Sequence, residues 1–163
     1  AAGCLKEIFG EDDVLSLKKQ PYTGTEMRTD GYYYFETDGR IFDVLFFYRD
    51  GILLETTGNI SSDSFIVMEK KFLDISWIKN VGDSKLYWGV FAINANQIQY
   101  EKWYPSSGGP FRTYIRSGEI LNDTAFVIKM SARSDGSSSM TLDRAFRFRP
   151  FSPKPDSTNQ FVP

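Results

Sequence analysis

The chain of 163 residues contains no histidine and a single cysteine, Cys4. Without histidine it lacks the usual general base near neutral pH, the Ser-His-Asp and Cys-His catalytic arrangements and the common histidine metal sites. One cysteine excludes a disulfide within the chain. No apolar run reaches the length of a membrane-spanning helix. We therefore expect no metal or other cofactor, and we expect that the protein is not an enzyme.

The net charge is also small. The formal net charge is −2, so the chain has no electrostatic reason to bind nucleic acid. Aromatic residues are abundant instead, at 16% of the chain, and at this density they favour strands and large apolar surfaces. The length suits one domain.

Alternating and aromatic runs separated by turn residues predict strands along most of the chain. In residues 97–104, for example, Gln97 and Gln99 share one face while Ile98 and Tyr100 share the other. Asp38-Gly39 and Asp50-Gly51 are turn dipeptides, and the asparagines of Asn94–Asn96 tolerate left-handed backbone angles. The expected strands are 31–38, 41–49, 52–57, 86–93, 97–104, 111–121, 124–133 and 140–148.

Two segments have helical features. Asp63 can cap a helix in which Phe65, Met68 and Phe72 fall at helical spacing, so we expect one amphipathic helix near 63–79. Residues 11–19 predict one or two further helical turns. Together with the strands, this gives three parts: a tether or short helix over 1–24, a β domain over 25–150 and an extended tail over 151–163.

The strands are joined mostly by tight turns, and no βαβ unit occurs. The fold class is therefore mainly β, an antiparallel up-and-down barrel of about eight strands with one inserted helix. A β-sandwich is the alternative. Closure into a barrel hides the strand edges that a chain rich in Phe and Tyr would otherwise expose.

This arrangement resembles the lipocalin or calycin superfamily, in particular small lipocalin-like lipoproteins of bacteria. The resemblance rests on Gly31-Tyr32-Tyr33, where the superfamily carries Gly-x-Trp on the first strand, and on Arg144 or Arg147 in the last strand. It implies that one of these arginines packs across Tyr33 and closes the barrel floor. It also implies a cup that binds a small hydrophobic molecule, with no catalytic apparatus.

The first four residues, Ala1-Ala2-Gly3-Cys4, resemble the end of a bacterial lipoprotein signal. This resemblance implies lipidation at Cys4 and a bacterial cell-envelope protein that is lipid-anchored at the outer membrane or the periplasmic face. Contact with the membrane would then be through the anchor only. The alternative is an unstructured N-terminus with an incidental cysteine.

The predicted ligand-binding residues are those that alternate toward the interior of such a barrel. Arg144 is the most informative, because it is in phase with Phe146 on an apolar face, where a charge must be paired or lie at a wet mouth. It either anchors an acidic head group or is a structural arginine, stacked on an aromatic ring or paired with a carboxylate. The complete predicted set is Tyr33, Phe35, Phe91, Tyr100, Arg144 and Phe146.

Further cations lie on the neighbouring strands. Lys102 is in phase with Tyr100, and Arg112, Tyr114 and Arg116 share another face. They form either a basic rim for an anionic ligand or a set of solvated outer positions. The strand carboxylates, among them Asp43 and Glu55, have no spacing that identifies a catalytic pair.

The leading hypothesis is thus a non-enzymatic, lipocalin-like lipoprotein domain that binds a small hydrophobic or amphipathic ligand in its barrel. The alternative is a structural or interaction module, with a filled barrel or sandwich, that recognises protein or glycan through surface aromatics. An enzyme that uses carboxylates or tyrosine is a third, weaker hypothesis.

Overall fold

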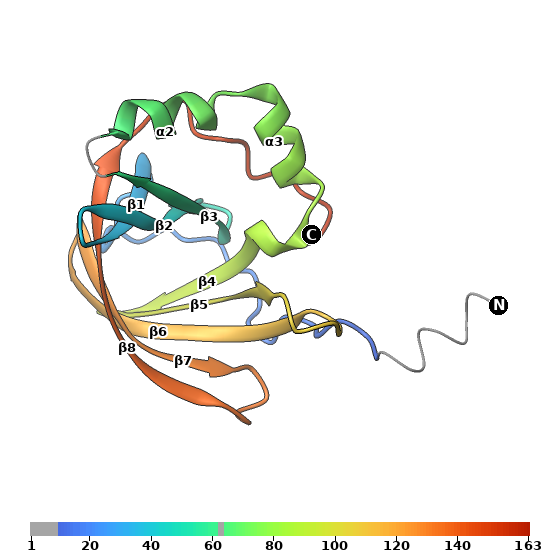
Figure 1. Cartoon of the computed structure of the whole chain (residues 1–163). Helices are drawn as coiled ribbons and strands as arrows, with labels where there is room; N and C mark the ends of the chain where they lie inside the picture. The colour runs from blue at the N-terminus through green and yellow to red at the C-terminus, as the bar shows by residue number, and fades with distance from the viewer. Residues whose placement is uncertain (1–9, 62–63) are drawn as a thin grey trace.

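The computed structural model describes residues 10–61 and 64–163 and confirms the antiparallel barrel (Figure 1). Each strand pairs with the next along the chain, and β8 pairs with β1 to close the barrel. The strands are β1 (Gly31–Thr37), β2 (Arg40–Phe47), β3 (Ile52–Ser61), β4 (Trp88–Asn94), β5 (Gln97–Tyr104), β6 (Arg112–Asn122), β7 (Ala125–Arg133) and β8 (Ser139–Pro150).

The turns explain this order. Asp38 and Gly39, between β1 and β2, both have positive φ angles, 50° and 69°, as a tight hairpin turn requires. Between β4 and β5 the left-handed residue is Ala95, with φ 53°, and not one of the flanking asparagines. At Ser117-Gly118 the register between β6 and β7 shifts, and a Cβ on Gly118 would lie only 1.8 Å from the carbonyl oxygen of Val127.

The β3–β4 ladder is short. Its three pairs are Ile52 with Val90, Leu53 with Gly89, and Leu54 with Trp88. Beyond them β3 continues to Ser61, and among the described residues β2 is its only neighbouring strand there. The barrel wall therefore has a lateral gap between β3 and β4.

The segment between β3 and β4 forms two helices and not the single helix that the sequence predicted. The helices are α2 (Phe65–Phe72) and α3 (Ile75–Gly82), and the short 3₁₀ turn η2 (Lys85–Tyr87) follows. The break comes at Asp74, whose side chain accepts a hydrogen bond from the Trp77 N–H at 3.0 Å and so begins a new helix. No helix in the described residues is long and apolar enough to cross a membrane.

The helical turns expected in residues 11–19 are absent. This stretch is an extended strap along the outside of β5 and β6. Buried Glu101 holds it there by accepting hydrogen bonds from the Ser16 and Leu17 N–H groups at 2.8 and 2.6 Å. The predicted lipidation residue, Cys4, lies outside the described residues.

The strands bury side chains on both faces, in two separate clusters. One cluster has members on all eight strands and lies in the barrel interior. The other covers the outer face of β1 to β5 and packs against α2, α3 and the C-terminal tail. The tail has no regular secondary structure and passes beneath the two helices (Figure 1), where Phe151 contacts Tyr32 and Phe72.

The chain before β1 closes one end of the barrel. Tyr22 and Met27 belong to the interior cluster, and the Tyr33 hydroxyl donates a hydrogen bond to the Asp123 carbonyl at 2.7 Å. The same hydroxyl accepts one from the Arg28 N–H at 3.0 Å. We call this end the floor. The loops β1–β2, β3–β4, β5–β6 and β7–β8 lie at the opposite, open end.

Candidate functional site

The floor half of the interior is packed with aromatic rings. Phe126 stacks on Phe146 at 4.8 Å between ring centroids, and Tyr33 and Phe47 lie 5.2 and 5.8 Å from Phe126. Phe91 lies 4.9 Å from Phe47. These distances place the rings in direct contact across the barrel.

The open half of the interior contains charges. Asp43 of β2, Glu55 of β3, Lys102 of β5, Arg116 of β6 and Arg144 of β8 form one cluster, joined by ion pairs. The Lys102 and Glu55 side chains are only 7% and 8% exposed, and those of Arg116 and Asp43 are 13% exposed. We call these five residues the charged cluster.

Two of its cations are loosely paired. The Arg116 Nη1 lies 3.5 Å from Glu55, 3.9 Å from Asp43 and 3.4 Å from the Tyr100 hydroxyl. The Lys102 Nζ lies 3.5 Å from Glu55. In contrast, Arg144 donates to Asp43 at 2.7 Å, a normal charged hydrogen bond.

Glycine makes room for Lys102. Gly89 of β4 pairs with Lys102 in the sheet, and a Cβ at Gly89 would come within 2.8 Å of the Lys102 Cβ. The lysine stem therefore occupies space that a side chain on β4 would fill. The ammonium group then lies 4.1 Å from the centre of the Tyr104 ring, and the Arg116 guanidinium lies 4.9 Å from it.

Burial shifts the titration of this cluster. It raises the pKa of the Asp43 carboxyl, and the negative charge of Glu55 adds to the shift. It lowers the pKa of the Lys102 ammonium, against the opposing effect of Glu55. Both shifts follow from the cost of holding a charge away from water.

Two openings reach the charged cluster. The gap between β3 and β4 forms a pocket of about 430 Å³ that Glu55, Thr57 and Lys102 line, and residues 80–87 cover it from outside. At the barrel mouth a second pocket, of about 300 Å³, is lined by Tyr104, Tyr114, Arg116, Ser131 and Met140. We call them the side pocket and the mouth pocket.

The structure distributes the six predicted ligand residues over both halves. Tyr33, Phe91 and Phe146 are buried in the packed floor half. Tyr100 lies at the boundary and contacts Arg116 through its hydroxyl. Phe35 and Arg144 lie toward the open end, and the Arg144 guanidinium is 5.5 Å from the Phe35 ring. Arg144 is thus both stacked and paired, the contacts of a structural arginine.

The crossing of Tyr33 by an arginine from β8 does not occur. Arg144 pairs with Asp43, and Arg147 lines a pocket on the outer surface. The ring neighbours of Tyr33 are Phe47, Phe126 and Phe148. The cation at the floor comes instead from the segment before β1, since the Arg28 guanidinium lies 4.5 Å from the centre of the Phe148 ring.

Sequence reasoning missed the charged cluster as a unit. Lys102 and Arg116 are inside the barrel, so the interpretation as solvated outer positions is wrong for both. The signal was present, because Lys102 is in phase with buried Ile98 and Tyr100. Asp43 and Glu55, which seemed scattered, also converge here, and Arg116 bridges them.

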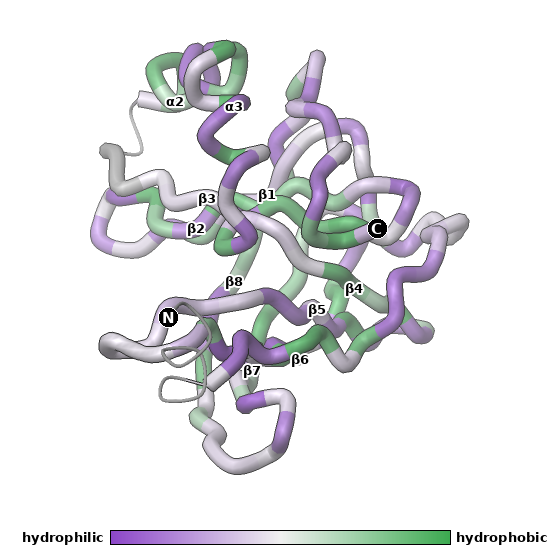
Figure 2. Tube along the Cα trace, turned by 90° about the vertical axis from the view of Figure 1, so that its right-hand side faces the viewer, coloured by the Kyte–Doolittle hydropathy of each residue, from purple (hydrophilic) through white to green (hydrophobic). Residues whose placement is uncertain are grey.

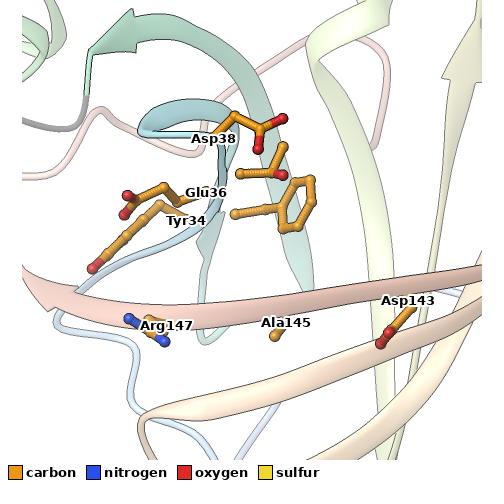
Figure 3. Close-up of a pocket in the computed structure, with 8 residues that line it drawn as sticks. Tyr34, Glu36, Asp38, Asp143, Ala145 and Arg147 are labelled. Carbon is orange, nitrogen blue, oxygen red and sulfur yellow. The ribbon is translucent and has the colours of Figure 1, made fainter.

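The pockets outside the barrel include two that segments far apart in the chain form together. Where β1 turns away from β8, a pocket of about 340 Å³ opens (Figure 3). Its labelled side chains include Glu36, Asp38, Asp143 and Arg147. The other, of about 300 Å³, lies between the N-terminal strap and the C-terminal tail, with Leu15, Trp103 and Val162 in its wall.

No protein-family model matches the chain, and neither a curated protein nor a solved structure is detectably similar to it. Within residues 10–61 and 64–163, no group of three or more acidic, histidine or cysteine side chains is placed to hold a metal ion. The arguments on function below therefore rest on the geometry of the barrel.

Proposed function

We propose that this protein is a lipocalin-like binding protein that takes up a small amphipathic molecule at the open end of its barrel, and that it performs no catalysis. The observation that carries the proposal is the convergence of the side pocket and the mouth pocket on one cluster of buried polar side chains. Their volumes fall in the lower part of the range of small-molecule sites.

The walls of these pockets suit a molecule with both polar and apolar parts. Leu86 and Tyr87 in the side pocket and Met140 in the mouth pocket offer apolar contact. Glu55, Lys102 and Arg116 offer polar contact at the inner end. Because aromatic side chains occupy the floor half, the ligand lies above them and not in a deep cup.

This role fits a protein anchored at a bacterial cell envelope through a lipid on Cys4, which remains part of the proposal. The anchor and the ligand site are independent claims. Loss of membrane association in a Cys4→Ser variant expressed in its native host tests the first. The second needs a direct measurement of binding.

The test of binding is a thermal-shift screen of amphipathic molecules and sterols on the wild type and on two variants with narrowed openings, Thr57→Trp and Ser131→Trp. We expect at least one compound to raise the melting temperature of the wild type and to lose its effect in one of these variants. Thr37→Trp, in the outer pocket, is the matched control and should respond as the wild type does. No shift with any compound, or equal shifts in all four proteins, would contradict the proposal.

The second candidate function is an interaction module, and one observation favours it. Apolar residues of the helix pair are exposed to solvent: Ile66, Val67, Leu73, Ile75 and Ile78. In Figure 2 the two helices carry both hydrophobic and hydrophilic residues above the barrel. A partner protein that protects these residues from surface labelling, together with a negative ligand screen, would favour this function over ligand binding.

A further inference from the structure

We propose that the ligand carries a single negative charge, a carboxylate head group, which Arg116 and Lys102 bind at the inner end of the two pockets. This inference rests on the proposed function and names the chemistry of its ligand. Three observations carry it: the charge balance of the cluster, the length of its contacts and an unpartnered donor.

The charged cluster has one positive charge too many. Lys102, Arg116 and Arg144 face two carboxylates, those of Asp43 and Glu55. At the rim nearby, Arg112 and Arg133 do not add to this excess, because Asp13 and Asp135 pair with them. A buried excess charge is costly unless a counter-charge reaches it. One monoanion would balance the cluster.

The contacts show where the excess lies. Arg144 and Asp43 satisfy one another at 2.7 Å. Glu55 must serve both Lys102 and Arg116, and each lies 3.5 Å from it, longer than a good charged hydrogen bond. Donor capacity is therefore left over on Lys102, which lines the side pocket, and on Arg116, which lines the mouth pocket.

Arg116 also has an unpartnered nitrogen. Its Nε is buried and has no hydrogen-bond partner among the described residues. The Nε of Arg133 shares this property, but the Nη2 of Arg133 lies 3.3 Å from both Asp13 and Asp135, closer than any carboxylate lies to Arg116. A guanidinium binds a carboxylate through two parallel N–H groups, and Arg116 retains donors for such a contact.

Charge also decides between anions. A dianion such as a phosphate monoester would turn an excess of one positive charge into an excess of one negative charge, within reach of Asp43 and Glu55. The cluster therefore favours a carboxylate over a phosphate. The apolar walls of the two pockets accommodate the rest of the molecule.

The experiment compares decanoate with decanol, which has the same chain length and no charge, by isothermal titration calorimetry below the aggregation limit of each compound. We expect the wild type to bind decanoate at least tenfold more tightly than decanol. Arg116→Gln should remove this preference, because it weakens the binding of decanoate far more than the binding of decanol. Arg147→Gln, an exposed arginine on the outer surface of β8, is the matched control and should keep the preference.

A second variant guards against loss of folding. Arg116→Lys keeps the charge and removes both Nε and the planar fork, so we expect a preference reduced severalfold but not abolished. The circular dichroism spectrum of each variant shows whether it is folded. A preference that persists in both Arg116 variants, or that is absent from the wild type, would overturn the inference.

Further probes separate this inference from the proposed function. Equal binding of decanoate and decanol would support the site for an amphipathic molecule and contradict the choice of a negatively charged head group. Acetate that binds as tightly as decanoate supports the anion site and contradicts an amphipathic ligand. Decyl phosphate that binds more tightly than decanoate overturns the choice of a carboxylate. Failure of every probe, and of the screen above, removes both proposals.

Discussion

The two halves of the barrel interior differ in how fully their side chains satisfy one another. In the floor half, phenylalanine rings contact each other, and the Tyr33 hydroxyl makes two hydrogen bonds. In the open half, cations outnumber carboxylates and their contacts are long. The floor half therefore stabilises the fold, whereas the open half holds charged donor groups that are free to bind a ligand.

The largest expected effect comes from the floor. Phe126→Ala removes a fully buried ring that contacts Tyr33, Phe47 and Phe146. We expect the free energy of unfolding to fall by about 3–5 kcal/mol, because the cavity cannot collapse in a closed barrel. Urea denaturation measures it. Phe42→Ala, at a residue 41% exposed, is the control, and similar losses in both variants would mean that the floor is not tightly packed.

An intermediate effect is expected in the charged cluster. Glu55→Gln removes the carboxylate that Lys102 and Arg116 share. Breaking a buried pair leaves an uncompensated charge, so we expect a loss of about 3 kcal/mol in the free energy of unfolding. The excess charge also rises from one to two, so decanoate should bind this variant more tightly than the wild type.

The matched control for Glu55→Gln is Glu119→Gln, which breaks a surface pair with Lys129 and should cost at most about 1 kcal/mol. Chemical denaturation with and without decanoate measures both effects. If Glu55→Gln lowers the free energy of unfolding no more than the control does, then water screens the charged cluster. That result would contradict the view that the open half holds a buried excess charge.

The smallest effect concerns a cation near the floor. Lys154 of the C-terminal tail donates to the carbonyls of Thr29 and Phe47 at 2.6 and 2.8 Å, and burial lowers its pKa from 10.5 to about 8. Between these two values the unfolded chain binds the proton more tightly than the folded one, so this lysine makes stability rise with pH.

We therefore compare the wild type with Lys154→Met, which lacks this titration. Between about pH 7.5 and about pH 9.5, the stability of the wild type should rise by about 2 kcal/mol relative to the variant. Denaturant titrations at several pH values measure the difference. Parallel profiles would show that the ammonium group is fully hydrated, and the tail would then not be tightly docked at this point.

Much of the fold could be predicted from the sequence, because strands and turns are local. The Asp38-Gly39 dipeptide and the alternation in residues 97–104 placed the β1–β2 and β4–β5 hairpins correctly. Eight strands joined mostly by tight turns then made closure the economical solution. The α2–α3 break was not predicted, because the apolar spacing runs through Asp74 and its capping bond is visible only in the structure.

The candidate site could be predicted only in part. An alternating pattern says which residues share a face, but not which face is inside when both are apolar. In β2, Val44 and Phe46 face the helices while Leu45 and Phe47 face the interior, and all four are buried. The convergence of Glu55 with Lys102 depends on the register of strands far apart in the chain, which no local signal reveals.

The short β3–β4 ladder has one more consequence. A barrel in which every strand is paired on both sides offers no backbone groups to another chain. The part of β3 beyond Leu54, in contrast, pairs with β2 and not with β4. Asn80, Ser84, Leu86 and Tyr87 lie opposite that stretch across the side pocket. The segment that carries these four residues therefore lies between this strand edge and any second chain, and it also forms one wall of the side pocket. Loosening it should expose both the unpaired edge of β3 and the charged cluster.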